Sequence, residues 1–229
     1  MVTLVVTKDC TALSDADLAE MAELCGGSGR AFEIGMLSKQ AEAWVLVTLA
    51  RDAHEALVGY SFCTLERIGG TPSILIGLAS VGRHDHSETV MRSILRDQMR
   101  RAVLAFPDED VLVGSRLAAA STFSAFAGLN DVIPRPGHKA SGEERAWGRR
   151  LAKRFGIDSG SYNDRSFTVS GDGSLQPLFD YLAPDHVEVH VDVAALFDPL
   201  DLDAGDVLIG FGWAMAEDLD ALLKETRGH

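Results

Sequence analysis

The pattern of apolar and polar positions is clearest in the middle of the N-terminal half. Residues 74–81 are almost continuously apolar, which is typical of a buried strand. A short charged loop follows at 82–86. From Val90 to Phe106, apolar side chains recur every three or four positions, which predicts a long amphipathic helix. This order places the free backbone N–H groups of a helix start at the loop, where they can bind an anion.

The residues before this segment predict a strand at 3–7 and two helices. The first helix follows Ser14, a typical N-cap residue, and the second covers 31–37. Three strands are predicted in series, at 43–49, 55–67 and 72–81. Because turn-forming residues separate these strands, we expect an antiparallel meander.

The residues after the long helix predict a strand at 111–113 that runs parallel to the strand before the helix. A polar connector rich in Gly, Ser, Asp and Asn at 156–165 is the best candidate boundary. We therefore expect an α/β core at 1–155 and a C-terminal extension at 156–229 that completes the sheet or packs on it. The other predicted elements are helices at 121–127, from Ser141 and at 216–224, a loop at 130–137, and strands at 166–169, 186–193 and 207–213.

Composition and charge exclude several classes of partner. The chain has 229 residues, of which 46% are hydrophobic, so it can bury a sizeable core without disulfides. Its three cysteines are widely spaced, which favours a reducing, cytoplasmic location, and no apolar run is long enough for a membrane span. The net charge is −13, and residues 171–229 carry 13 acidic but only 2 basic residues. Nucleic acid and anionic membranes are therefore disfavoured. The acidic surface could attract a cationic acceptor such as an amine, but solubility is the interpretation of the charge that we favour.

The order of these elements, with the charged loop between the third meander strand and the long helix, resembles the GCN5-related N-acetyltransferase (GNAT) superfamily. The resemblance covers residues 2–155 and implies a mixed, largely antiparallel sheet flanked by helices. It also implies that acetyl-coenzyme A is the co-substrate, and that its acetyl group passes to an amine of a small molecule or a protein. In the family, this loop reads Arg or Gln, two residues, Gly, one residue, then Gly or Ala, and its amides bind the cofactor pyrophosphate.

The loop of this chain matches that motif only in its first half. Arg83 stands at the basic position, but His86 and Glu88 stand where glycine and glycine or alanine are expected. Asp85 and Glu88 also have the spacing of a capping box, which would occupy the amides and add negative charge beside a phosphate. The resemblance assigns donor contacts to six residues: Ala79, Val81, Arg83, His84, His86 and Ser87. Backbone amides near residues 79–81 would polarise the thioester carbonyl.

Amine acetylation needs a base for the acceptor amine and an acid for the departing thiolate. The resemblance implies Glu66, at the end of the second meander strand, as the base and Tyr162 as the acid. The alternative for Glu66 is a solvated charge at a strand end. Tyr162 lies in the connector, later in the chain than the family pattern expects. A second reading of the whole chain is a GNAT-like binding or regulatory module without catalytic activity.

A third hypothesis, a metal-binding protein, rests on the alternation of polar and apolar residues at 186–193. His186, Glu188, His190 and Asp192 alternate with valines, so a strand would place the four polar side chains on one face. A His-x-Glu-x-His face has ligand types suited to zinc or iron. The alternative, which we favour, is an amphipathic strand with polar groups in water and no bound metal. Such an exposed strand could pair across a two-fold axis in a homodimer.

Overall fold

The computed structural model describes residues 2–28, 32–126, 128–182 and 189–219. The helices are α1 (Asp15–Ser28), α2 (Ile34–Ala43), α3 (Ser87–Ala105), α4 (Gly142–Arg154) and α5 (Val191–Ala194), with short 3-10 helices η1 (Cys10–Ala12) and η2 (Ala120–Phe126). The strands are β1 (Val2–Asp9), β2 (Leu46–Asp52), β3 (Leu57–Ile68), β4 (Thr71–Val81), β5 (Val111–Leu117), β6 (Asn130–Ile133), β7 (Tyr162–Asn163), β8 (Thr168–Val169), β9 (Phe179–Asp180) and β10 (Val207–Ala214).

All of these strands belong to one mixed sheet. Their order is β1-β2-β3-β4-β9-β5-β10-β8-β7, and β6 pairs with β10 outside this path. Strands β2, β3 and β4 form the predicted antiparallel meander, and β4 and β5 are parallel on either side of the α3 crossover. The predicted α/β class, a mixed sheet flanked by helices, is therefore confirmed. The segment after residue 156 supplies β7 to β10 to the same sheet.

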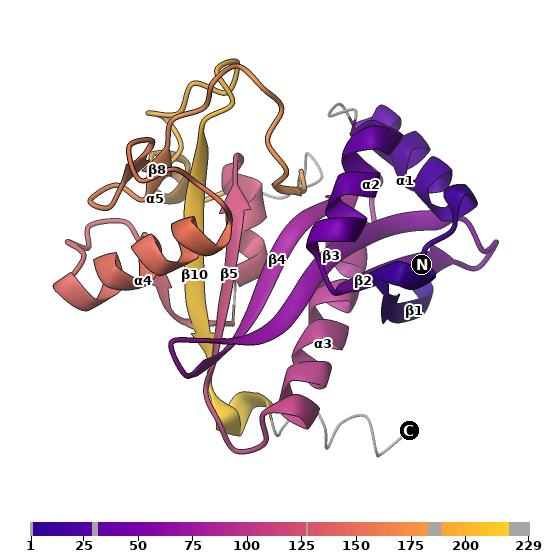
Figure 1. Cartoon of the computed structure of the whole chain (residues 1–229), viewed down its shortest axis with the longest axis horizontal. Coiled ribbons are helices and arrows are strands. Elements are labelled where there is room, and N and C mark those ends of the chain that lie inside the picture. The colour runs from indigo at the N-terminus through magenta and orange to yellow at the C-terminus, as the bar shows by residue number, and fades with distance from the viewer. Residues whose placement is uncertain (1, 29–31, 127, 183–188, 220–229) are drawn as a thin grey trace.

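The helices cover opposite faces of the sheet (Figure 1). Helices α1, α2 and α4 lie on one face, and α3 lies behind the sheet on the other. The apolar stripe of α3 makes this packing favourable, because Val90, Met91 and Ile94 are all buried against the sheet. Trp147 and Leu151 bury the inner side of α4 in the same way on the first face.

Side-chain caps fix the starts of two helices where the sequence predicts them. The Ser14 hydroxyl accepts a hydrogen bond from the Asp17 amide at 3.2 Å, and the Asp17 carboxylate accepts from the Ser14 amide at 2.8 Å. Ser141 and Glu144 form the same reciprocal capping box before α4. Each box satisfies amides that the first turn leaves without a helical partner.

The structure corrects three local predictions. Residues 130–133 form β6 and not a loop, because β10 offers a pairing edge there. Residues 191–194 form the short helix α5 and not a strand, and the His190 side chain accepts from the Asp192 amide at the helix start. The second helix begins at Ile34, three residues later than predicted. Within the described ranges, no helix has both the length and the apolar character needed to span a membrane.

Candidate functional site

Strands β4 and β5 form a fork in the middle of the sheet. They pair directly over a short stretch, from Ser73 opposite Leu112 to Leu75 opposite Gly114. The Ser115 hydroxyl then donates to the Ile76 carbonyl at 3.1 Å, and beyond this bond the strands diverge toward their C-terminal ends. We call this divergence the fork and the Ser115–Ile76 bond its apex. Figure 1 shows the fork opening toward the top of the view.

The chain fills this fork with its own strand β9. Phe179 lies opposite Ala79 on one side and Leu117 on the other, in parallel pairing with both strands. The Leu178 carbonyl accepts a hydrogen bond from the Ala79 amide at 3.0 Å. The Tyr181 carbonyl accepts from the Ser121 hydroxyl at 2.9 Å, which holds the outgoing end of the segment. In Figure 1 this is the orange segment that descends between β5 and α2.

Two of the residues that are predicted to contact acetyl-coenzyme A, Ala79 and Val81, therefore lie inside the sheet. The Ala79 amide, expected to polarise a thioester carbonyl, already binds the carbonyl of Leu178. Val81 is buried and lies opposite Gly59 of β3. A donor could reach the Ala79 amide only in the place that β9 occupies.

The loop before α3 is open to solvent, and the predicted capping box is wrong. The N-cap residue is His86, not Asp85, and no side chain caps it. Glu88 instead pairs with Arg92 at 2.6 Å, because the two lie one helical turn apart. A cap needs an extended N-cap backbone, and His86 has φ −104° and ψ 11°. The Ser87 amide donates to the His84 carbonyl at 2.9 Å, so the first turn of α3 keeps the Glu88 and Thr89 amides for an anion.

The other predicted residues of this loop lie together at its surface. Arg83, His84 and His86 are exposed, whereas Ser87 is buried at the first helical position. The His84 ring accepts a hydrogen bond from the His86 amide at 3.1 Å. Partial burial, together with the neighbouring His86 ring, lowers the pKa of His84, so this ring is mainly neutral at pH 7.

A buried arginine lies beside the apex of the fork. Arg116 lies next to Ser115 on β5, and its side chain points to the face that carries α4. Its guanidinium is 5.0 Å from the centre of the Phe155 ring, and Phe155 contacts Trp44. Trp44 in turn packs directly on Gly77 of β4, where a Cβ would overlap its ring. Phe155 and Trp44 thus bridge the two arms of the fork above Arg116.

A row of buried polar groups crosses the same face of the fork. Tyr60 lies opposite Ser80, and Ser80 lies opposite Asp180 of β9. The Tyr60 hydroxyl and the Cys25 sulfur are 2.7 Å apart. Burial raises the pKa of Tyr60 and that of Cys25, so both groups keep their protons at neutral pH.

The sequence analysis missed Arg116 and Asp180 for different reasons. Arg116 stands within an apolar run that continues beyond the predicted strand at 111–113, and a charge inside a buried strand was an available signal. Asp180 lies on a two-residue strand, which is too short to give a periodic pattern.

The structure does not bring Glu66 and Tyr162 to the fork. Glu66 lies opposite Ser73, at the closed end, and accepts a bond from Arg154 at 2.6 Å. It is five positions along β3 from Ser61, which faces Ala79, and this corresponds to roughly 16 Å at 3.3 Å per residue. Tyr162 lies on β7, three strands beyond β5 in the sheet, and burial raises its pKa.

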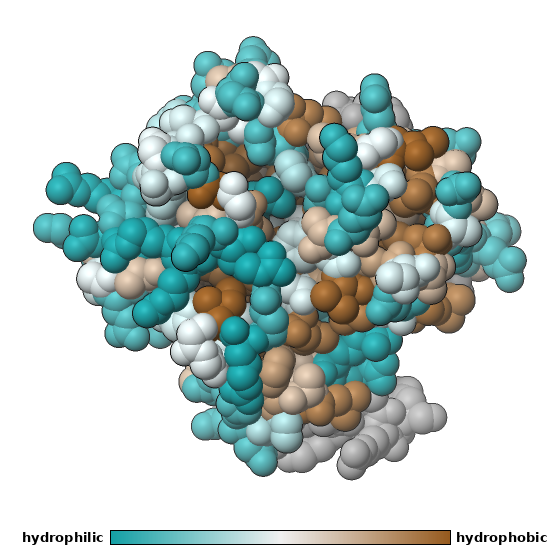
Figure 2. All heavy atoms as spheres, in the orientation of Figure 1, coloured by the Kyte–Doolittle hydropathy of each residue, from teal (hydrophilic) through white to brown (hydrophobic). Residues whose placement is uncertain are grey.

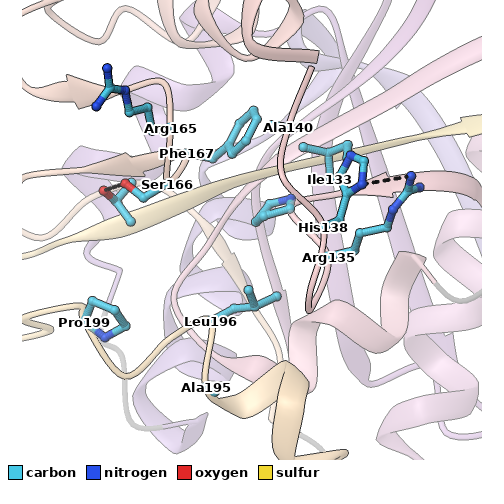
Figure 3. Close-up of a pocket in the computed structure, with 12 residues that line it drawn as sticks. Ile133, Arg135, His138, Ala140, Arg165, Ser166, Phe167, Ala195, Leu196 and Pro199 are labelled. Carbon is cyan, nitrogen blue, oxygen red and sulfur yellow. Dashed lines mark hydrogen bonds between the residues drawn. The ribbon is translucent and has the colours of Figure 1, made fainter. Parts of the chain in front are cut away.

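Several surface hollows lie outside the fork, and two of them contain residues of the sequence analysis. One has a volume of about 210 Å3. Figure 3 shows this hollow with His138 and Arg135 on one side and Arg165 and Ser166 on the other. His138 is 3.0 Å from Glu144, and Arg135 is 3.0 Å from Asp131, so the chain's own carboxylates already pair with these groups. The second hollow, about 790 Å3, lies along the C-terminal half of α4 and residues 157–165. Figure 2 shows that the surface over α4 is mainly hydrophilic.

The predicted metal-binding face is only partly within the described residues. His186 and Glu188 lie outside them, whereas His190 and Asp192 lie at the start of α5, with their side chains 3.5 Å apart. Among the residues that the structure describes, no group of three or more His, Cys, Asp or Glu side chains could hold a metal ion.

No protein-family model matches the chain, and no curated protein matches it. Solved acetyltransferases are similar to it in structure. One is the GNAT family N-acetyltransferase YhbS from Escherichia coli in complex with CoA (14% identity, 54% of this chain, 66% of that chain, TM-score 0.39). Two more are a phosphinothricin acetyltransferase from Sinorhizobium meliloti with AcCoA (11%, 61% and 83%, 0.40) and an IAA acetyltransferase from Bacillus cereus (9%, 92% and 100%, 0.41). The chain thus spans just under two thirds of the length of the first. At such identities and TM-scores, the function has to be argued from the chain's own geometry.

Proposed function

We propose that this protein is an N-acyltransferase that moves an acetyl group from acetyl-coenzyme A to an amine. The observation that supports this most is the fork between β4 and β5. It already holds an extended chain whose carbonyl accepts a hydrogen bond from the Ala79 amide. The same amide is suited to bind and polarise a thioester carbonyl, because a fixed donor stabilises the charge that develops on the oxygen.

The groups around the fork fit the two ends of such a donor. The uncapped first turn of α3 follows β4 after the short loop 82–86 and offers amides to a pyrophosphate, with the exposed Arg83 in that loop. The extended pantetheine chain of acetyl-coenzyme A would take the place of β9 along β4. Binding of the donor therefore requires β9 to leave the fork, and the structure corresponds to a closed form of the site.

The acceptor would be an amine of a small molecule or of a protein. The acidic residues of the C-terminal segment favour a cationic group of this kind. We also propose a cytoplasmic protein that forms a homodimer and binds neither nucleic acid nor membrane. The three cysteines are buried and form no disulfide with one another, which is compatible with a reducing compartment.

The roles of Glu66 as base and Tyr162 as acid stay predictions. A proton-transfer role requires that Glu66→Gln or Tyr162→Phe lower kcat by about 100-fold or more in a folded protein. The measurement is the release of free thiol from acetyl-CoA. Unchanged kcat in either variant would remove that residue from the mechanism.

Thermal unfolding with acetyl-CoA tests the proposed function. Because a ligand that binds the native state stabilises it, acetyl-CoA at 100 times its Kd should add about 2.7 kcal/mol and raise the Tm. Free coenzyme A should act similarly, and adenosine alone should act weakly. Absence of any shift at millimolar acetyl-CoA, both in the wild type and in a variant with weakened β9, would overturn the proposal.

A non-catalytic binding or regulatory module is the second candidate, and β9 is the observation in its favour. The segment makes main-chain pairs with both arms of the fork, and its phenylalanine is buried. In this reading β9 is a permanent strand of the sheet. The two candidates differ in one measurable property, because only the enzyme binds the donor after β9 is weakened.

A further inference from the structure

Within the described part of the chain, the buried cation Arg116 has no partner anion. Only 5% of the residue is exposed, and its Nε atom has no hydrogen-bond partner. Among the residues that the structure describes, its single recorded contact is the Phe155 ring. Burial lowers the pKa of Arg116 to about 10, which still leaves the side chain charged at neutral pH.

Several partly buried arginines of this chain have carboxylate partners, whereas the half-buried Arg145 has none recorded among the described residues. Arg101 lies 2.8 Å from Asp97, and Arg154 lies 2.6 Å from Glu66. An unpaired charge in an apolar interior is costly, so such groups are normally paired or bind an ion. The Phe155 ring is the one group recorded against this charge within the described residues, and a ring face does not replace a hydrogen-bonded anion, which suggests that a ligand supplies the anion.

The position of Arg116 indicates where that ligand lies. Because Leu117 pairs with Phe179 in parallel, Arg116 lies beside Leu178, whose carbonyl binds the Ala79 amide. Ile209 of β10 lies on the opposite side of Arg116. When β9 leaves the fork, Arg116 loses its neighbour Leu178 and faces the place where the thioester carbonyl would lie. The stacked Phe155 ring holds the guanidinium plane in a fixed orientation.

We propose that Arg116 binds a carboxylate of one of the two substrates, next to the apex of the fork. This proposal rests on the proposed acyl transfer, since a substrate reaches Arg116 only when β9 is displaced. A guanidinium can bind a carboxylate through two parallel hydrogen bonds, which suits a planar anion held at a fixed angle. The carboxylate belongs either to an acceptor of the amino-acid type or to the acyl group of a dicarboxylic thioester.

The first test measures stability without ligand. Arg116→Met removes the buried charge at similar length, so the Tm should rise by about 2–4 °C or more. Arg150→Met is the matched control, because Arg150 also stacks on an aromatic ring, 4.6 Å from the centre of Trp147, but is exposed. Its Tm should change little. A lower Tm for Arg116→Met, or failure of that variant to fold, would show that the guanidinium is structural and would overturn the proposal.

The second test compares matched ligands by calorimetry and thermal shift. In the donor arm, succinyl-CoA is compared with butyryl-CoA, which has a methyl group in place of the carboxylate. In the acceptor arm, with coenzyme A present, a mixture of L-amino acids is compared with their decarboxylated amines. One arm should show a preference for the carboxylate of about 30-fold or more, lost in Arg116→Met and reduced in Arg116→Lys. The arm that responds identifies the source of the carboxylate.

The outcomes separate this proposal from the proposed function. If coenzyme A thioesters bind but neither arm shows a carboxylate preference, the role of Arg116 is wrong and the acyltransferase proposal stands. If no coenzyme A compound binds, the acyltransferase proposal fails. The thermal shift with succinate alone then tests whether Arg116 binds a carboxylate. In that case succinate should raise the Tm of the wild type and not that of Arg116→Met, and equal shifts would overturn the carboxylate site.

Discussion

Replacing Phe179 with alanine should increase the affinity for acetyl-CoA although it lowers the stability of the protein. Phe179 is 2% exposed and is the main apolar anchor of β9, whose pairing with the fork covers two residues. Removal of a buried phenylalanine side chain typically costs about 3–5 kcal/mol. If about 3 kcal/mol of this loss destabilises the closed form relative to the open form, the equilibrium between the two forms shifts by about 150-fold. The apparent Kd of a donor that needs the open form falls by up to the same factor.

Titration calorimetry with acetyl-CoA measures this change, and hydrogen exchange at the Ala79 amide measures the opening of β9 directly. The matched control is Phe167→Ala, since Phe167 is 1% exposed and packs against Phe211, away from the fork. Both variants should lose stability, but only Phe179→Ala should bind the donor more tightly and exchange the Ala79 amide faster. Equal affinities in both variants and the wild type would refute the competition between β9 and the donor.

Three further changes test separate parts of the structure. Glu88→Gln removes a carboxylate at the start of α3, so the affinity for acetyl-CoA should rise by an amount on the order of 1 kcal/mol, more at low salt, in calorimetry at two ionic strengths. Burial would raise the pKa of Asp17, but hydrogen bonds from Ser14 and the Lys8 ammonium outweigh it and hold the pKa at about 2. Asp17→Asn should therefore cost about 2 kcal/mol at pH 7, and the difference in urea unfolding should vanish between pH 4 and 2 as the wild type loses this stabilisation; a constant difference would contradict this origin. Gly77→Ala should lower stability by about 1–3 kcal/mol and shift tryptophan fluorescence, since the added Cβ overlaps the Trp44 ring; unchanged spectra would contradict this packing.

The sequence predicts the central elements well where one local pattern decides the structure. The three-to-four-residue period from Val90 onward identifies α3, because a single apolar face meets the sheet. Ser141 identifies the start of α4, because the cap and its partner lie three residues apart. The same spacing at Asp85 and Glu88 gives no cap, because the backbone at His86 is not extended and the helix begins one residue later.

The contents of the fork could not be predicted in the same way. The pairing of Ala79 with Phe179 joins positions 100 residues apart through a strand of two residues. Nothing in the local composition of such a short strand indicates its partner, so long-range packing decides where it lies. The alternation around His190 shows the opposite failure, because a pattern typical of a strand lies partly in a helix that the His190 side chain caps.

The attachment of β9 to the same chain has a consequence for any diffusing molecule that binds between β4 and β5. A competing segment that is covalently attached acts at an effective concentration, which reaches the millimolar range when the links are short and flexible. Dilution of the protein does not reduce this effective concentration. The concentration of the diffusing molecule, relative to its own Kd, must therefore exceed a threshold that is set by the intramolecular pairing of β9 with the fork. Changes in the length of the two connections that flank β9 would move the threshold, while all contacts of the bound molecule stay the same.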